Sequence, residues 1–377
     1  MKRIISLIFA CTFLTFFCAD VHAVDTQIFS EYTDSLETLV EKMPSELKEK
    51  YTGIFETPDG VEKIRKSISF SSFADFLFNS LEEAWPSILR LFFSLATLTL
   101  CAGIFHNFNT SLTSPALSGA VSFCITLAFV ILMTGSVDTL LTNALLYLEN
   151  LTNFSSAMVP ITVSVTAASG KLTAATVSHA SLMLLFTLIQ NIGTTILSPV
   201  VRTSYCLGIA GAVGGMVRLD SVSKCIRKVF TIVLTFLSLS LGFIIGTQNI
   251  LARSADTFSL KTVKFALGNI IPIIGGAMSD AVSTVTTSFA VIRSAAGGMC
   301  VLAIVVFLLP ILVQLVLHRL LFSALKGAAE MMGCDREAKV MEEVHGTIGY
   351  ILAVVSLVSL LFLFIISLFT LLGEASV

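Results

Sequence analysis

The sequence predicts an all-α, polytopic integral membrane protein with about six to eight transmembrane helices behind a cleavable signal peptide. Hydrophobic residues make up 55% of the 377-residue chain and charged residues only 13%, whereas ordinary soluble domains carry about 25% charged residues. The chain also contains several uncharged apolar runs of about 20 residues, the length that a helix needs to cross a bilayer. Two further apolar segments are interrupted by proline and glycine.

Residues 1–23 have the pattern of a secretory signal peptide. Lys2 and Arg3 precede an apolar run, and Ala23 ends a stretch with small residues where signal peptidase cuts. The apolar run of about 14 residues is short for a transmembrane helix, which needs about 20. We therefore expect cleavage after Ala23.

Residues 24–84 are expected to form an acidic, helical, extracytoplasmic region. This stretch contains thirteen acidic and six basic residues. A helix is predicted from Ser72, with Asp75 three residues later as in a capping box. Its phenylalanine-rich face, which ends at Trp85, either lies in the headgroup region or packs against a partner protein.

Residues 85–377 are expected to form the transmembrane domain. The sequence predicts spans at Pro86–Phe105, Ala116–Met133, Ala174–Val200, Val229–Leu251, Ala295–Leu317 and Thr347–Leu372. Lysine and arginine favour the cytoplasmic side, which places the loops 202–228 and 319–345 inside. Basic residues also occur between Ala252 and Ser294, so a further span there would invert the C-terminal half.

Two segments fit neither a regular span nor a soluble loop: Asn153–Gly170 and Lys264–Thr287. Proline removes a backbone donor and glycine loosens a helix, and irregular backbone at membrane depth needs shelter from protein or water. Both segments are therefore candidates for re-entrant hairpins or discontinuous helices. The candidate helix-break and conduction residues are Pro160, Pro272, Gly275, Gly276 and Asp280.

The two interrupted segments suggest a tandem repeat, residues 151–251 and 264–372. Each segment is followed by a span, a basic inner segment and another span, at a spacing of about 112 to 116 residues. Asp220 and Lys224 correspond to Asp335 and Lys339 at one constant offset. Paired interrupted segments of this kind indicate a transport site, but chance similarity between small-residue-rich segments explains the match as well.

Few residues offer catalytic chemistry. His179, Gln190 and Asn191 lie in a predicted span, where a polar residue is either functional or bonded to a neighbouring helix. Asp138 and Asp256 are suited to line a watery path. The sequence has no P-loop, no His-Glu-x-x-His and no Cys-x-x-Cys, so we expect no catalytic, cofactor or metal site.

The run KFALGNIIPIIGGAMSDA, from Lys264 to Ala281, resembles the core of the stage III sporulation protein AE family. The signal sequence, the acidic outer region and the C-terminal apolar span agree with this resemblance. It implies a subunit of a secretion-like or feeding channel in the mother-cell membrane that surrounds the forespore. It also implies partners among the other stage III A proteins, including a cytoplasmic ATPase and ring-forming subunits, and through them the forespore stage II protein Q.

Two other functions fit the same residues. The first is a self-sufficient secondary transporter whose substrate crosses between the two repeats. The second is a membrane scaffold without a conducting path. None of the three readings is an enzyme.

Overall fold

The computed structural model describes residues 70–109, 115–168, 171–214, 219–270 and 275–371. Within these ranges the chain is almost entirely helical and contains no strand, which confirms the predicted all-α class. The helices are α5 (Phe70–Asn109), α6 (Pro115–Ala168), α7 (Leu172–Gln190), the π-helix η1 (Asn191–Leu197), α8 (Ser198–Gly214), α9 (Leu219–Ile270), α10 (Gly275–Met331) and α11 (Asp335–Leu371). The expected signal peptide and most of the acidic region lie outside the described residues.

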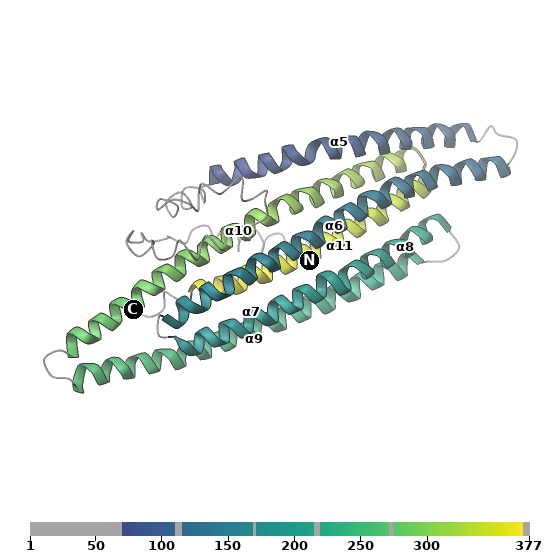
Figure 1. Cartoon of the computed structure of the whole chain (residues 1–377). Helices are drawn as coiled ribbons and strands as arrows, with labels where there is room; N and C mark the ends of the chain where they lie inside the picture. The colour runs from purple at the N-terminus through teal and green to yellow at the C-terminus, as the bar shows by residue number, and fades with distance from the viewer. Residues whose placement is uncertain (1–69, 110–114, 169–170, 215–218, 271–274, 372–377) are drawn as a thin grey trace.

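The helices form a bundle of six long rods. α7, η1 and α8 follow one another without a gap and make a single rod in Figure 1. Rods that follow one another in the chain alternate in direction, so the chain reverses at one end after α5, α8 and α10 and at the other end after α6 and α9. At the turn after α10, Gly333 has a φ of 75°, a left-handed conformation that favours glycine.

Seven helices of the described residues are long and apolar enough to cross a membrane. Six of these candidate spans overlap the six predicted ones. The seventh, Thr195–Gly214, extends into the predicted inner loop 202–228, so residues 202–214 are helix and not loop. The basic charge of Arg202 suggested a loop, but this arginine lies inside α8 and is neutralised by Asp138 on α6, 2.9 Å away.

The predicted interruption around Pro160 is also corrected. α6 is 54 residues long and remains helical to Ala168. A proline removes only one helical hydrogen bond, and membrane helices tolerate this loss because neighbouring groups satisfy the freed carbonyl. The stretch 135–173, expected to be an outer segment, is therefore mostly helix.

The second predicted interruption falls between α9 and α10. α9 continues to Ile270 and α10 begins at Gly275, while Pro272 lies in the short stretch outside the described residues. The candidate spans of these two helices end at Ser259 and begin at Ile304. Helix α9 covers residues 264–270 and helix α10 residues 275–287, and the re-entrant arrangement expected for this segment stays a prediction.

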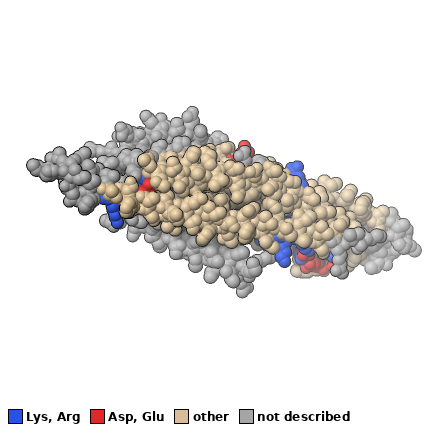
Figure 2. Space-filling view, turned by 90° about the horizontal axis from the view of Figure 1, so that it is seen from below, with Lys and Arg blue, Asp and Glu red and all other residues tan. Residues whose placement is uncertain are grey.

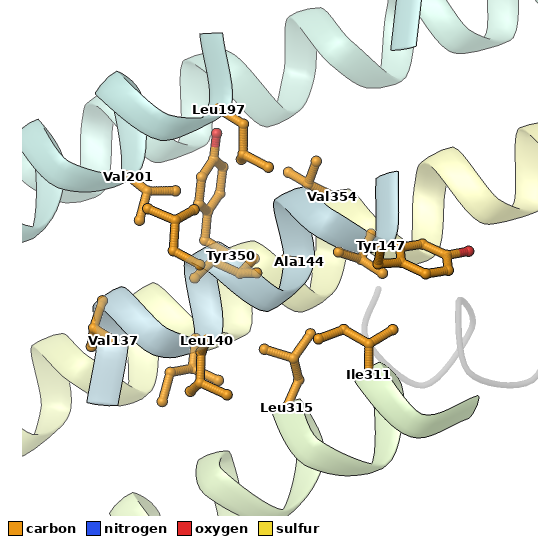
Figure 3. Close-up of a cluster of buried hydrophobic side chains, with 14 of the residues drawn as sticks. Val137, Leu140, Ala144, Tyr147, Leu197, Val201, Ile311, Leu315, Tyr350 and Val354 are labelled. Carbon is orange, nitrogen blue, oxygen red and sulfur yellow. The ribbon is translucent and has the colours of Figure 1, made fainter. Parts of the chain in front are cut away.

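The core lies around α11, which packs against α10, α8, α9 and α6. Figure 3 shows where four of these rods meet around Leu140, Tyr147, Leu315 and Val354. α6 contributes Val137, Leu140, Ala144 and Tyr147 at helical spacing, all almost fully buried. One face of α6 is therefore fixed against the core, and its opposite face points outward.

α9 and α11 run in the same direction and lie side by side. Arg227 bonds to Glu343 and Thr347, residues 116 and 120 positions later, and the Phe230 ring packs against the ring of Tyr350. These offsets are close to the repeat spacing in the sequence. The tandem repeat itself stays a prediction.

Candidate functional site

A group of charged side chains is buried between α9, α10 and α11. Arg227 on α9 is only 7% exposed and Glu343 on α11 only 2%, and the two form an ion pair. Charged residues are almost never fully buried unless they are paired. We call the group the charged cluster, and its members are Ser223, Lys224, Arg227, Lys326, Glu330, Glu342, Glu343 and Thr347.

Hydrogen bonds hold the central pair in place. Arg227 donates from Nη1 to the Thr347 hydroxyl at 3.0 Å and from Nη2 to the Ser223 hydroxyl. The Ser223 hydroxyl donates in turn to Glu343 Oε2 at 3.4 Å. Lys224 Nζ approaches the other oxygen of the same carboxylate at 3.5 Å. Each charge of the buried pair therefore has several polar partners, which a buried ion pair needs to offset its desolvation.

Partly exposed members of the charged cluster form its rim and connect it to α10. Lys326 Nζ lies 3.3 Å from Glu342 Oε2 and 3.6 Å from Glu330 Oε1. These rim pairs are partly exposed and add little stability by themselves. Together with the buried pair they connect α9, α10 and α11 at one level of the bundle.

Two glycines make room for the buried pair. A Cβ on Gly208 of α8 would lie only 2.9 Å from the carboxyl carbon of Glu343. A Cβ on Gly346 of α11 would lie 3.1 Å from Arg227 Nη1. Small residues allow close helix approach in membranes; here Gly208 lets α8 approach Glu343 of α11, and Gly346 lets α11 approach Arg227 of α9.

Further polar contacts surround the charged cluster. Glu337 is 6% exposed and accepts a hydrogen bond from the Thr126 hydroxyl of α6 at 2.8 Å. Arg319 Nε donates to His345 Nε2 at 3.1 Å. The structure thus brings the described parts of the predicted inner segments 202–228 and 319–345 together at one end of the bundle, and their placement on the cytoplasmic side stays a prediction.

The predicted break residues lie far from the charged cluster. Gly275, Gly276 and Asp280 are in the first turns of α10, and Gly275 precedes Arg319 by 44 residues in the same helix. At 1.5 Å per residue this separation is about 66 Å. A conduction role for these residues and for Pro160 and Pro272 stays a prediction.

The predicted intramembrane polar residues lie on one rod. His179 on α7 and Asn191 at the start of η1 are exposed, and Gln190 ends α7. Asn191 donates from Nδ2 to the Thr187 carbonyl, one turn earlier in its own helix, at 2.9 Å. Asn191 therefore bonds within its own helix and not, as we considered, to a neighbouring helix.

Asp256 has a structural role that its sequence position did not indicate. It is 4% exposed, and its carboxylate accepts hydrogen bonds from the backbone N–H groups of Thr173 and Ala174 at 3.1 and 2.7 Å. These N–H groups begin α7, so a side chain of α9 caps a different helix. An anion at a helix N-terminus is favoured by the unpaired N–H groups and the helix dipole.

Replacing Asp256 by alanine should lower the free energy of unfolding by about 1–2 kcal/mol, the usual cost of losing a helix cap. Asp256→Asn should lose less, because its amide oxygen still accepts one hydrogen bond. The measurement is the thermal unfolding midpoint of the purified chain in detergent. Equal losses for both variants would show that charge, and not the cap, is the stabilising property.

Cysteine and metal chemistry have little basis in the described part of the chain. No group of three or more His, Cys, Asp or Glu residues gathers there in a way that could hold a metal ion. Cys334, in the turn between α10 and α11, is buried and unpaired. Burial raises the pKa of its thiol, and the nearby carboxylates of Glu337 and Asp335 raise it further, which makes this thiol a poor nucleophile.

The long apolar helices define a multi-pass helical membrane protein. The chain belongs to the stage III sporulation protein AE family, whose family model matches residues 56–373. This confirms the family resemblance and implies a role in sporulation. The family is not named for an enzymatic activity.

A relative from Bacillus subtilis (strain 168), described as stage III sporulation protein AE, is 23% identical over 302 residues. The matched region covers 79% of this chain and 74% of the relative. No solved structure matches the chain.

Proposed function

We propose that the chain is an integral membrane subunit of the sporulation-specific channel complex between mother cell and forespore. It acts in the mother-cell membrane that surrounds the forespore and is required for late forespore development. The observation that carries the proposal is the extent of the family match. Residues 56–373 include all seven candidate spans, from Phe78 to Ser367, so the whole membrane domain shares the family's character.

The charged cluster supports a working membrane subunit more than a passive anchor. Buried charges are costly to desolvate unless they are paired, and the Arg227–Glu343 pair joins α9 to α11 directly beside their charge-free stretches. An anchor needs only apolar side chains at the positions of Arg227 and Glu343. The proposed partners are the other stage III A proteins, including a cytoplasmic ATPase and ring-forming subunits, and through them the forespore stage II protein Q.

Deletion of the gene in its endospore-forming host tests the proposal. We expect the count of heat-resistant spores to fall by several orders of magnitude after engulfment, with vegetative growth unchanged and spore counts restored by a wild-type copy. Normal spore counts in the deletion strain would contradict the proposal. Solute accumulation by the purified chain alone in liposomes would instead favour the self-sufficient transporter.

A further inference from the structure

Three neighbouring helices each have a long charge-free stretch, and together these stretches define one apolar level of the bundle. α9 has no charged residue from Val229 to Ala252, α10 none from Ser294 to Leu317, and α11 none from Gly346 to Leu371. Twenty-four helical residues extend about 36 Å, close to the hydrocarbon thickness of about 30 Å. Figure 2 shows a broad uncharged surface along the middle of the bundle, with charged side chains towards both ends. We call this zone the apolar belt.

Two hydrogen bonds place α6 inside the apolar belt. The Tyr147 and Ser359 hydroxyls lie 2.7 Å apart, and Ser359 is near the middle of the charge-free stretch of α11. Asn143 Nδ2 donates to Gln314 Oε1 of α10 at 3.1 Å, within the second charge-free stretch. Glu149, two residues after Tyr147, therefore lies near the middle of the apolar belt.

A line of polar side chains follows the outward face of α6 at this depth, beside the exposed Leu146. Asp138, Thr142, Glu149, Asn153 and Ser156 are all exposed, and their spacing of 4, 11, 15 and 18 residues from Asp138 keeps them on one helix face. They extend over about 27 Å of the helix. Glu149 has no ion pair within the described ranges.

The neighbouring rod continues this polar face. Arg202 on α8 bonds to Asp138 of α6 at 2.9 Å, and both side chains are about 60% exposed, at 61% and 58% respectively. The rods are antiparallel, so Asn191, 11 residues before Arg202, lies level with Glu149, 11 residues after Asp138. We call the combined face the polar strip, and its exposed members are Asp138, Thr142, Glu149, Asn153, Ser156, Thr187, Asn191, Thr195 and Arg202.

The exposed face of α9 shows what the lipid side of this bundle looks like. At comparable depth it presents Ile232, Phe236, Leu239 and Phe243, which are 58 to 73% exposed and suit contact with hydrocarbon. A carboxylate such as Glu149 in the same setting is strongly disfavoured. The Ser, Thr and Asn side chains of the polar strip would also suit a helix–helix interface, whereas the carboxylate of Glu149 and the exposed charges of Asp138 and Arg202 require hydration. Water is the occupant that suits them.

We propose that the polar strip lines a water-filled path across the apolar belt when the chain is assembled in its complex. Water hydrates Glu149 and the exposed Asp138–Arg202 pair, while the α9 face contacts lipid. The π-helical segment η1 lies at the middle of the path, and π-helical turns are frequent at functional sites. This inference rests on the proposed function, because it supplies the conducting surface of the proposed channel subunit.

Cysteine accessibility in membranes of sporulating cells tests the proposal. The full chain, with its other cysteines replaced, carries Thr142→Cys or Asn153→Cys in the polar strip, or Leu239→Cys or Phe243→Cys on the α9 face as controls. Thiol reagents react with the thiolate, which forms only in contact with water. A charged, membrane-impermeant methanethiosulfonate should therefore modify the strip cysteines about 100-fold faster than the controls.

Two results would overturn the path. In the first, the strip cysteines react with the reagent as slowly as the α9 controls, and a bimane label attached to them is quenched by brominated lipids. This result would show that lipid covers the polar strip. Slow modification without such quenching would show that a protein partner covers it.

A second measurement uses the unaltered chain. A water-soluble carbodiimide with an added amine converts an accessible carboxylate to an amide, and mass spectrometry should find this adduct at Glu149. Glu149→Gln is the control without a carboxylate. If Glu149 is labelled by a lipid-soluble carbodiimide and not by the water-soluble one, the proposed water-filled path is contradicted. Normal sporulation of the deletion strain would contradict the proposed channel function. Slow modification of the strip cysteines together with a sporulation defect would contradict only the water-filled path.

Discussion

Glu343→Leu is expected to lower the free energy of unfolding by about 3–5 kcal/mol, because it leaves Arg227 buried without its carboxylate. The substitution keeps the side-chain volume similar, so the loss reports the missing charge and not a cavity. Lys224 retains Glu342 as a partner, and the destabilisation should therefore centre on Arg227. Thermal or denaturant unfolding of the purified chain in detergent measures the effect.

A double variant and an exposed pair provide the controls. In Arg227→Met/Glu343→Leu both charges are gone, and most of the lost stability should return because apolar replacement of a buried pair is often neutral or stabilising. Asp138→Asn breaks the exposed pair with Arg202 and should cost less than about 1 kcal/mol. If the double variant is as unstable as Glu343→Leu, the pair is not the source of the effect. If it folds but does not support spore formation, the pair acts in function as well.

Gly208→Ala is expected to destabilise the chain by about 1–3 kcal/mol, the usual cost of forcing an extra group into a packed interface. The new methyl group would collide with the Glu343 carboxylate, which its ion pair with Arg227 and its contact with Lys224 hold in place. α8 would then have to move away from α11, and spore counts should fall with stability.

Gly327→Ala and Gly135→Ala are the matched controls. Both glycines lie inside long helices, and a Cβ at either position meets nothing within 4 Å. Alanine stabilises a helix interior by about 0.5–1 kcal/mol relative to glycine, so both controls should gain stability. A gain for Gly208→Ala of the same size would show that α8 and Glu343 are not in the close contact described.

The sequence predicted the helical membrane class and the six spans well, because long apolar runs have few other stable structures. It failed where one charged residue lies inside a long helix. Arg202 was assigned to a loop because a lone arginine is costly in a span, and only the fold shows that Asp138 of α6 neutralises it. Glu149 was not predicted as a functional residue for a related reason. The stretch 135–173, between two predicted spans, was expected outside the membrane, where a carboxylate is ordinary.

The charged cluster was predicted only in part. The sequence placed the basic segments around Lys224 and Lys339 on one side of the membrane, and the structure brings the two segments together. The pairing of Arg227 with Glu343 depends on the register of two parallel helices more than 100 residues apart in the chain. Local sequence patterns carry no information on that register, so the buried pair required the tertiary structure.

The length of α9 and α10 determines how far the two helices extend beyond the apolar belt. Beyond the apolar belt α9 continues through 18 residues, from Arg253 to Ile270, and α10 begins 19 residues before it, from Gly275 to Arg293. Each extension amounts to about 27 Å of helix, almost a second hydrocarbon thickness. The two helices thus form a rigid spacer, and any protein that docks at its tip is held at that stand-off from the membrane surface.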